Sequence, residues 1–212
     1  MSAITKTISA KVYVANENED IDYGLQIQKN SKDILNIPNV WDIFISHASA
    51  GKTVYPDEKE FVLFLYEILT TKYKKKVYLD LISNPTMIDT EITRAAQRSE
   101  YGVFICSSRY VNIFNGNRTE SYITEFDRIP REVNIFFTKA RWQGKCIIPI
   151  RFGLEESAYE QRGPFPGTRT ISIEDEITKK SIEKAEFIAK KIVERIMEGK
   201  KIGTIKKAAV TS

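Results

Sequence analysis

From Val40 onward, short apolar segments alternate with longer segments of helical periodicity. Four segments rich in apolar, β-branched and aromatic residues are predicted as strands: Trp41–Ser46, Val77–Asp80, Tyr101–Cys106 and Cys146–Ile150. A fifth, shorter strand is expected at Arg169–Ile173. Apolar strands separated by helices are typical of a parallel sheet that is covered on both faces. We therefore expect an α/β protein, with a parallel sheet and helices on both faces.

The expected helices show apolar residues at three- and four-residue spacing. They are a helix from Pro56 to the lysine-rich segment Lys72–Lys76, Ile88–Ser99, Ile129–Lys139 and Ser181–Met197. Pro130 is expected in a first helical turn, because a proline deeper in a helix removes a hydrogen bond and clashes with the preceding turn. Pro149 predicts an edge position or a strand end, since proline cannot donate to a sheet. Leu81–Met87 is predicted to be a loop.

The length and composition suit one folded domain, because 212 residues with 42% apolar content can bury a core. We expect residues 1–39 to form an N-terminal arm and residues 40–175 to form the α/β domain. Residues 176–200 are expected to add a C-terminal helix to this domain, and residues 201–212 to form a disordered basic tail.

The charge and the cysteines narrow the range of partners. The net charge of +4 is small, and the stretch from Ile177 onward has ten Lys or Arg against four Glu, so the excess is local. Nucleic acid is therefore not an expected partner. No segment has the apolar character of a membrane span or a signal peptide, so no membrane is expected either. Cys106 and Cys146 lie in apolar runs without a CxxC spacing, which favours reduced thiols, no metal site and a cytoplasmic location.

The segment Trp41–Thr53 (WDIFISHASAGKT) ends like a phosphate-binding loop. Such a loop needs GxxxxGK[ST], because its backbone amides must wrap a phosphate without side chains in the way. The position five residues before Gly51 is Ser46, so the first glycine is missing. The sequence therefore argues against a nucleoside triphosphatase.

The same strand resembles the opening of the TIR domain family, the Toll-type signalling fold. Val77–Asp80 resembles the family's second strand, and Ile92–Tyr110 (ITRAAQRSEYGVFICSSRY) its following helix and strand. Gly144–Ile150 (GKCIIPI) resembles its late strand. The resemblance runs in order from about Val40 to Phe152 and implies a flavodoxin-like parallel sheet.

Enzymatic members of the family cleave the nicotinamide–ribose bond of NAD+ with one glutamate near the start of the fourth helix. The resemblance favours Glu132, twelve residues before Gly144 and followed by an apolar residue. Arg128 stands where the family usually has tryptophan. Glu125 is the alternative, and an exposed helix glutamate without catalytic function is the ordinary interpretation of either.

The cleavage chemistry is compatible with a single carboxylate. Nicotinamide leaves NAD+ as a neutral molecule, and the ribose cation that remains can be stabilised by a nearby carboxylate. NAD+ would be the substrate, so no cofactor is expected. The residues expected to line its site are Ser46, His47, Ala48, Lys52, Asp80 and Tyr110. His47 as a backbone-bonded loop histidine and Lys52 as a solvated lysine remain open alternatives.

The resemblance leaves two classes of function. The first is an NAD+ glycohydrolase or ADP-ribosyl cyclase, similar to the stand-alone bacterial TIR proteins of antiviral defence. Such proteins self-associate, and a downstream effector senses their ADP-ribose or cyclic product. The second is a non-enzymatic TIR–TIR interaction module that docks through the Leu81–Met87 loop.

Overall fold

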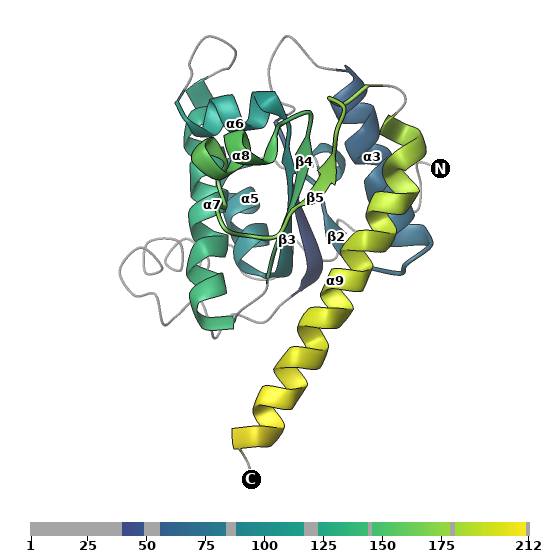
Figure 1. The fold of residues 1–212 in the computed structure, drawn as a ribbon, viewed down its shortest axis with the longest axis vertical. Coiled ribbons are helices and arrows are strands. Elements are labelled where there is room, and N and C mark those ends of the chain that lie inside the picture. The colour runs from purple at the N-terminus through teal and green to yellow at the C-terminus, as the bar shows by residue number, and fades with distance from the viewer. Residues whose placement is uncertain are drawn as a thin grey trace.

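A five-stranded, entirely parallel sheet forms the centre of the computed structural model, which describes residues 40–48, 56–83, 88–116, 123–143, 146–178 and 181–210 (Figure 1). The strands are β1 (Trp41–Ser46), β2 (Val77–Tyr78), β3 (Ser99–Cys106), β4 (Ile147–Phe152) and β5 (Ile171–Ile173). Their spatial order is β2-β1-β3-β4-β5. This is the order of flavodoxin-like sheets, and the predicted α/β class is confirmed.

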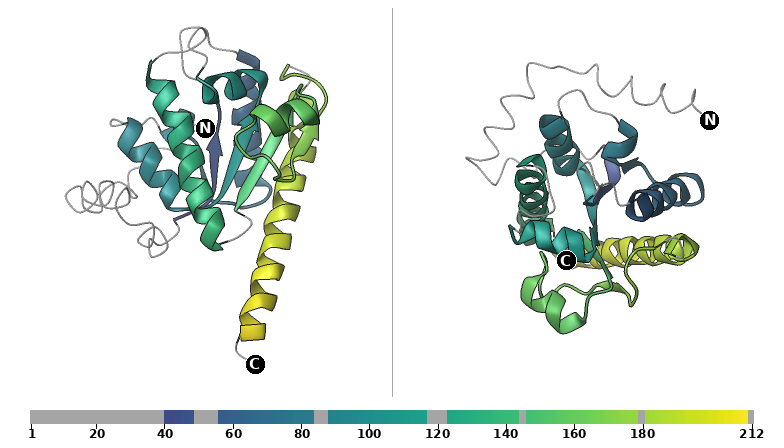
Figure 2. Two further views of the ribbon diagram at one scale, coloured as in Figure 1. Left: turned by 60° about the vertical axis from the view of Figure 1, so that its left-hand side comes forward. Right: turned by 90° about the horizontal axis from the view of Figure 1, so that it is seen from above.

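Helices cover both faces of the sheet (Figure 2). They are α3 (Pro56–Thr71), α4 (Asp80–Ser83), α5 (Ile88–Gln97), α6 (Ser108–Phe114), α7 (Ile123–Gln143), α8 (Glu156–Arg162) and α9 (Ser181–Val210). Helices α3 and α9 pack on one face, while α5, α6 and α7 pack on the other.

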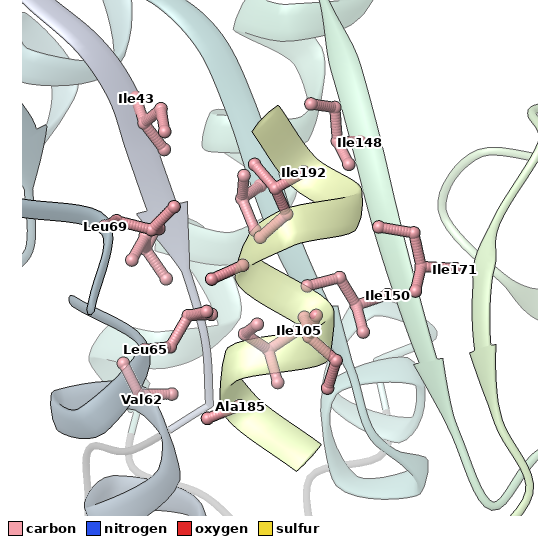
Figure 3. Packing of buried hydrophobic residues seen from close by; sticks show 14 of the residues in the cluster. Ile43, Val62, Leu65, Leu69, Ile105, Ile148, Ile150, Ile171, Ala185 and Ile192 are labelled. Atoms are coloured by element: carbon pink, nitrogen blue, oxygen red, sulfur yellow. The ribbon is translucent and has the colours of Figure 1, made fainter. Parts of the chain in front are cut away.

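Alternation along each strand produces two separate cores, because successive side chains of a strand point to opposite faces. In β1, Ile43 and Ile45 face α3 and α9, whereas Phe44 faces α5 and α7. Figure 3 shows the first of these cores, where Leu65 of α3 and Ile192 of α9 lie against the strands. Burying one such side chain stabilises the fold by roughly 1.5–3 kcal/mol.

The position of Pro130 in helix α7 differs from the prediction. It begins at Ile123, six residues earlier than expected, so Pro130 lies inside the helix and not in its first turn. An internal proline costs on the order of 3 kcal/mol. Ile129 and Val133 on either side of Pro130 are buried against the sheet, and this packing offsets the cost.

The second proline, Pro149, lies within β4, which is an inner strand in the sheet order. Strand β4 is therefore not an edge strand and Pro149 is not at its end, but Pro149 itself has an edge position, because it is paired on one side only. The missing N–H is tolerated because β5 pairs with β4 only from Ile150 onward. Beside Pro149, β4 has a neighbouring strand only on the β3 side, at Phe104.

Several element ends also differ from the predictions. Strand β2 ends at Tyr78 and not at the predicted Asp80, and the short helix α4 extends from Asp80 into the predicted loop Leu81–Met87. Helix α9 continues to Val210, so the expected disordered tail is helical through that residue and projects beyond the sheet (Figure 1). Extending a formed helix adds one hydrogen bond per residue, which explains the continuation. The predicted arm of residues 1–39 lies outside the described residues.

Candidate functional site

The order of the strands makes the carboxyl ends of β1 and β3 the expected place for a ligand-binding crevice. Strand order reverses there, because β2 lies on one side of β1 and β3 to β5 lie on the other. In open parallel sheets, ligands bind outside the carboxyl ends of the strands at such a reversal. Ser46 is the last residue of β1, and Ser107 follows the last residue of β3.

Three buried side chains from three elements form a hydrogen-bonded chain at this edge. Ser46 Oγ donates to Glu132 Oε2 of α7 at 2.5 Å, and it lies 2.8 Å from the hydroxyl of Tyr110 in α6. Because Ser46 has one proton, the Tyr110 hydroxyl must donate to Ser46 in this arrangement. Glu132 is only 5% exposed, and the other two side chains are fully buried. The carboxyl group of Glu132 therefore has a defined position at the end of β1.

A second group joins the residue after β1 to α4 and α7. His47 Nε2 lies 2.7 Å from Asp80 Oδ1, and Arg128 Nη1 lies 3.5 Å from Asp80 Oδ2. The backbone N–H of Leu81 also donates to Asp80 Oδ1, at 2.8 Å. Arg128 and Glu132 are four residues apart on α7, a spacing that puts them on one helix face. Helix α7 thus positions a member of each group.

Glu58 of α3 was not predicted as a site residue, yet it is buried at the same edge, with 4% exposure. Its Oε1 accepts the backbone N–H of Ala48 at 3.3 Å, and its Oε2 accepts the hydroxyl of Ser107 at 3.2 Å. Arg109 Nη1 donates to the carbonyl of Ala48. Glu58 and Arg109 therefore fix the N–H and the carbonyl of Ala48, just after β1.

One sequence signal could have indicated Glu58. It lies four residues before Val62 and seven before Leu65, which places it on the apolar stripe of α3. A glutamate at such a position needs polar partners in the interior.

Burial changes the protonation of the two glutamates. It raises the pKa of Glu132 to about 8, and the hydrogen bond from Ser46 offsets only part of that shift. It also raises the pKa of Glu58 to about 7, against the charge of His47 and the hydrogen bonds from Ala48 and Ser107. Glu132 therefore holds a proton at neutral pH and can ionise when a cation approaches.

Asp80 and His47 shift in opposite directions. Burial alone would raise the pKa of Asp80, but the charge and hydrogen bond of His47, together with Arg128, bring it below its ordinary value. Burial alone would lower the pKa of His47, but the charge and hydrogen bond of Asp80 outweigh burial and raise it. The two shifts favour an imidazolium–carboxylate pair.

The structure thus brings together most of the predicted residues: Ser46, Tyr110 and Glu132 form one chain, His47 pairs with Asp80, and Ala48 contributes its backbone. Lys52 lies outside the described residues. Glu125 lies in α7, and its side chain is outside the described part. Among the side chains that are described, no three His, Cys, Asp or Glu gather as a metal site would require.

We expect Asp80→Asn to lower the pKa of His47, because removing the adjacent negative charge leaves burial as the dominant influence. His47 is the only histidine in the chain, so an NMR titration of tag-free protein reads it without ambiguity. Asp175→Asn, at an exposed aspartate, serves as the control. An unchanged pKa of His47 in Asp80→Asn would show that the pair does not form in solution.

Comparison of the chain with family models, with curated proteins and with solved structures finds no match. Within the described residues, no helix combines the length and the apolar character needed to cross a membrane. The fold and the site define an α/β protein with buried carboxyl groups at the edge of the sheet where the strand order reverses.

Proposed function

We propose that this chain is a TIR-type NAD+ nucleosidase in which Glu132 is the catalytic carboxylate. The observation that carries the proposal is the position of Glu132, buried and hydrogen-bonded to the last residue of β1. That position is the edge at which sheets of this order bind ligands. The four sequence segments that resemble TIR domains, in the same order, support the same function.

The proposed reaction breaks the C1′–N bond between ribose and nicotinamide. Nicotinamide takes the electron pair of that bond and leaves neutral, so its departure needs no proton donor. The ribose is left with the positive charge, which ionised Glu132 stabilises in a site with little water. Glu132 is largely protonated at neutral pH. The positive charge of the bound nicotinamide ring must therefore first lower the pKa of Glu132, so that the carboxyl group ionises.

A nucleophile then attacks C1′. Water forms ADP-ribose and loses a proton, whereas a nitrogen of the adenine in the same molecule forms a cyclic product. In this proposal Glu132 accepts the proton of an attacking water once nicotinamide has gone. A cyclic product would be suited to signalling, in line with the antiviral function that the resemblance implies.

The neighbouring residues have supporting functions in this proposal. Ser46 and Tyr110 orient the carboxyl group of Glu132. The side chain of His47 is 2% exposed, and its Nδ1 has no hydrogen-bond partner among the described residues. As an imidazolium, His47 would therefore have an N–H to donate to a ribose or phosphate oxygen of the substrate.

The direct test incubates the full chain with NAD+ and quantifies nicotinamide by liquid chromatography. ADP-ribose and cyclic ADP-ribose are separated in the same run. A series of protein concentrations is needed, since the activity per molecule should rise with concentration if self-association completes the site. Release of nicotinamide supports the proposal.

Absence of nicotinamide release across the whole concentration series would contradict the enzyme proposal. If sedimentation of the same samples then showed self-association, the chain would instead be a non-enzymatic TIR–TIR interaction module. In that case the buried Glu132–Ser46 contact would serve only to hold α7 on the sheet.

A further inference from the structure

A cavity of about 450 Å³, widely open to solvent, lies at the opposite end of the sheet from Glu132. Ile147 and Ile148, the first residues of β4, form part of its wall, and Ala140 near the end of α7 forms another part. Adjacent residues of a strand point to opposite faces, so the cavity reaches around the edge of β4. Its volume falls within the range of small-molecule sites.

The short β5 explains why this space exists. Strand β5 pairs with β4 only from Ile150, and Pro149 has no N–H with which a longer β5 could pair. The chain between α8 and β5 instead passes in a wide arc (Figure 1). Residues 168 and 169 of this arc line the cavity together with α9.

The polar part of the lining carries excess positive charge. It consists of Thr168, Arg169, Arg195 and Glu198, so two arginines face one glutamate. Arg195 is fixed, because its Nη1 and Nη2 donate to the carbonyls of Arg169 and Thr170, each at 2.6 Å. These two bonds use only two of the five donors of a guanidinium group.

No carboxylate in the described part of the chain lies within ion-pair distance of Arg195 or Arg169. Burial and the charge of Arg169 both lower the pKa of Arg195, and only Glu198 opposes them. The positive charge at the cavity is therefore incompletely compensated, and an anion placed beside both arginines would be stabilised.

We propose that this cavity binds a small organic anion with an apolar body, whose charged group contacts Arg169 and Arg195 and whose body contacts Ala140, Ile147 and Ile148. The site is separate from Glu132 and does not depend on the nucleosidase proposal. Its size and its single net positive charge favour one monoanionic ligand.

The probe for this site is 8-anilino-1-naphthalenesulfonate, titrated into the full chain and followed by calorimetry. We expect one saturable site, and binding about tenfold weaker for N-phenyl-1-naphthylamine, which lacks the sulfonate. Arg169→Ala should weaken the binding of the sulfonate by about tenfold as well. Arg131→Ala, at an exposed arginine of α7, and Glu132→Gln should leave it unchanged.

Two variants that fill the cavity locate the binding. Ala140→Phe and Thr168→Trp should each abolish saturable binding while the protein keeps its circular dichroism spectrum. Thr168 lies outside the helices and strands, so the Thr168→Trp variant should fold even if Ala140→Phe does not. Absence of saturable binding to the unmodified chain would overturn the proposal. So would binding that persists in a folded filling variant, or equal binding of the uncharged probe.

Discussion

Glu132→Gln is expected to lower the kcat/KM for nicotinamide release from NAD+ by roughly a thousandfold, the upper range for loss of one preorganised electrostatic group. Glutamine keeps the shape and can still accept a hydrogen bond from Ser46, but it cannot carry the negative charge that stabilises a ribose cation. The measurement is the initial rate at low NAD+ concentration, for both proteins at equal concentration.

The matched control is Glu125→Gln, a carboxylate on the same helix seven residues earlier. It should retain nearly full activity. Loss of activity in Glu125→Gln with activity retained in Glu132→Gln would transfer the catalytic function to Glu125. In the unmodified protein, kcat/KM should rise with pH and reach half of its maximum near pH 8, because the ionised form of Glu132 is the active one.

Glu132→Gln is also expected to make the protein more stable, by about 4 kcal/mol near pH 8 and by less than about 1 kcal/mol near pH 4.5. The pKa of Glu132 is about 8 in the folded protein against an ordinary value of 4.5. Between these values the folded state keeps a proton that the unfolded state releases, so the wild type loses stability as pH rises. Glutamine resembles the protonated carboxyl group at every pH and avoids this loss.

Urea unfolding of both proteins at several pH values between 4.5 and 8.5 measures this difference. The contribution of Glu58, whose pKa is raised in the same direction, is common to both proteins and largely cancels. A variant that is less stable than the wild type at pH 8 would mean that Glu132 is ionised in the folded protein. Loss of activity together with a gain in stability would mark a residue retained for its function.

Parts of the site were predictable because they lie at strand ends. Ser46 is the last residue of an apolar strand, His47 follows it, and Asp80 comes shortly after the next strand, so their position at one edge comes from the parallel arrangement alone. The involvement of Glu58 was not predictable in this way. An acidic residue in a first helical turn normally faces water. Only the packing of α3 on the sheet shows that the carboxyl group of Glu58 lies between the ends of β1 and β3.

The two prolines show the same limit for the fold. Proline rules concern local backbone geometry, and they placed Pro130 at a helix start and Pro149 at a sheet edge or a strand end. In the structure, burial of Ile129 and Val133 keeps α7 continuous, and the late start of β5 leaves the side of Pro149 without a partner strand. In both cases neighbours distant in sequence decided the outcome.

The alternation of apolar strands with amphipathic helices determined by itself that this chain is an α/β protein, because apolar periodicity depends only on local sequence. Tertiary structure alone decided the strand order, the burial that raises the pKa of Glu132 and the cavity beside β4. These depend on contacts between segments far apart in the chain, and local sequence carries no record of which segments will meet.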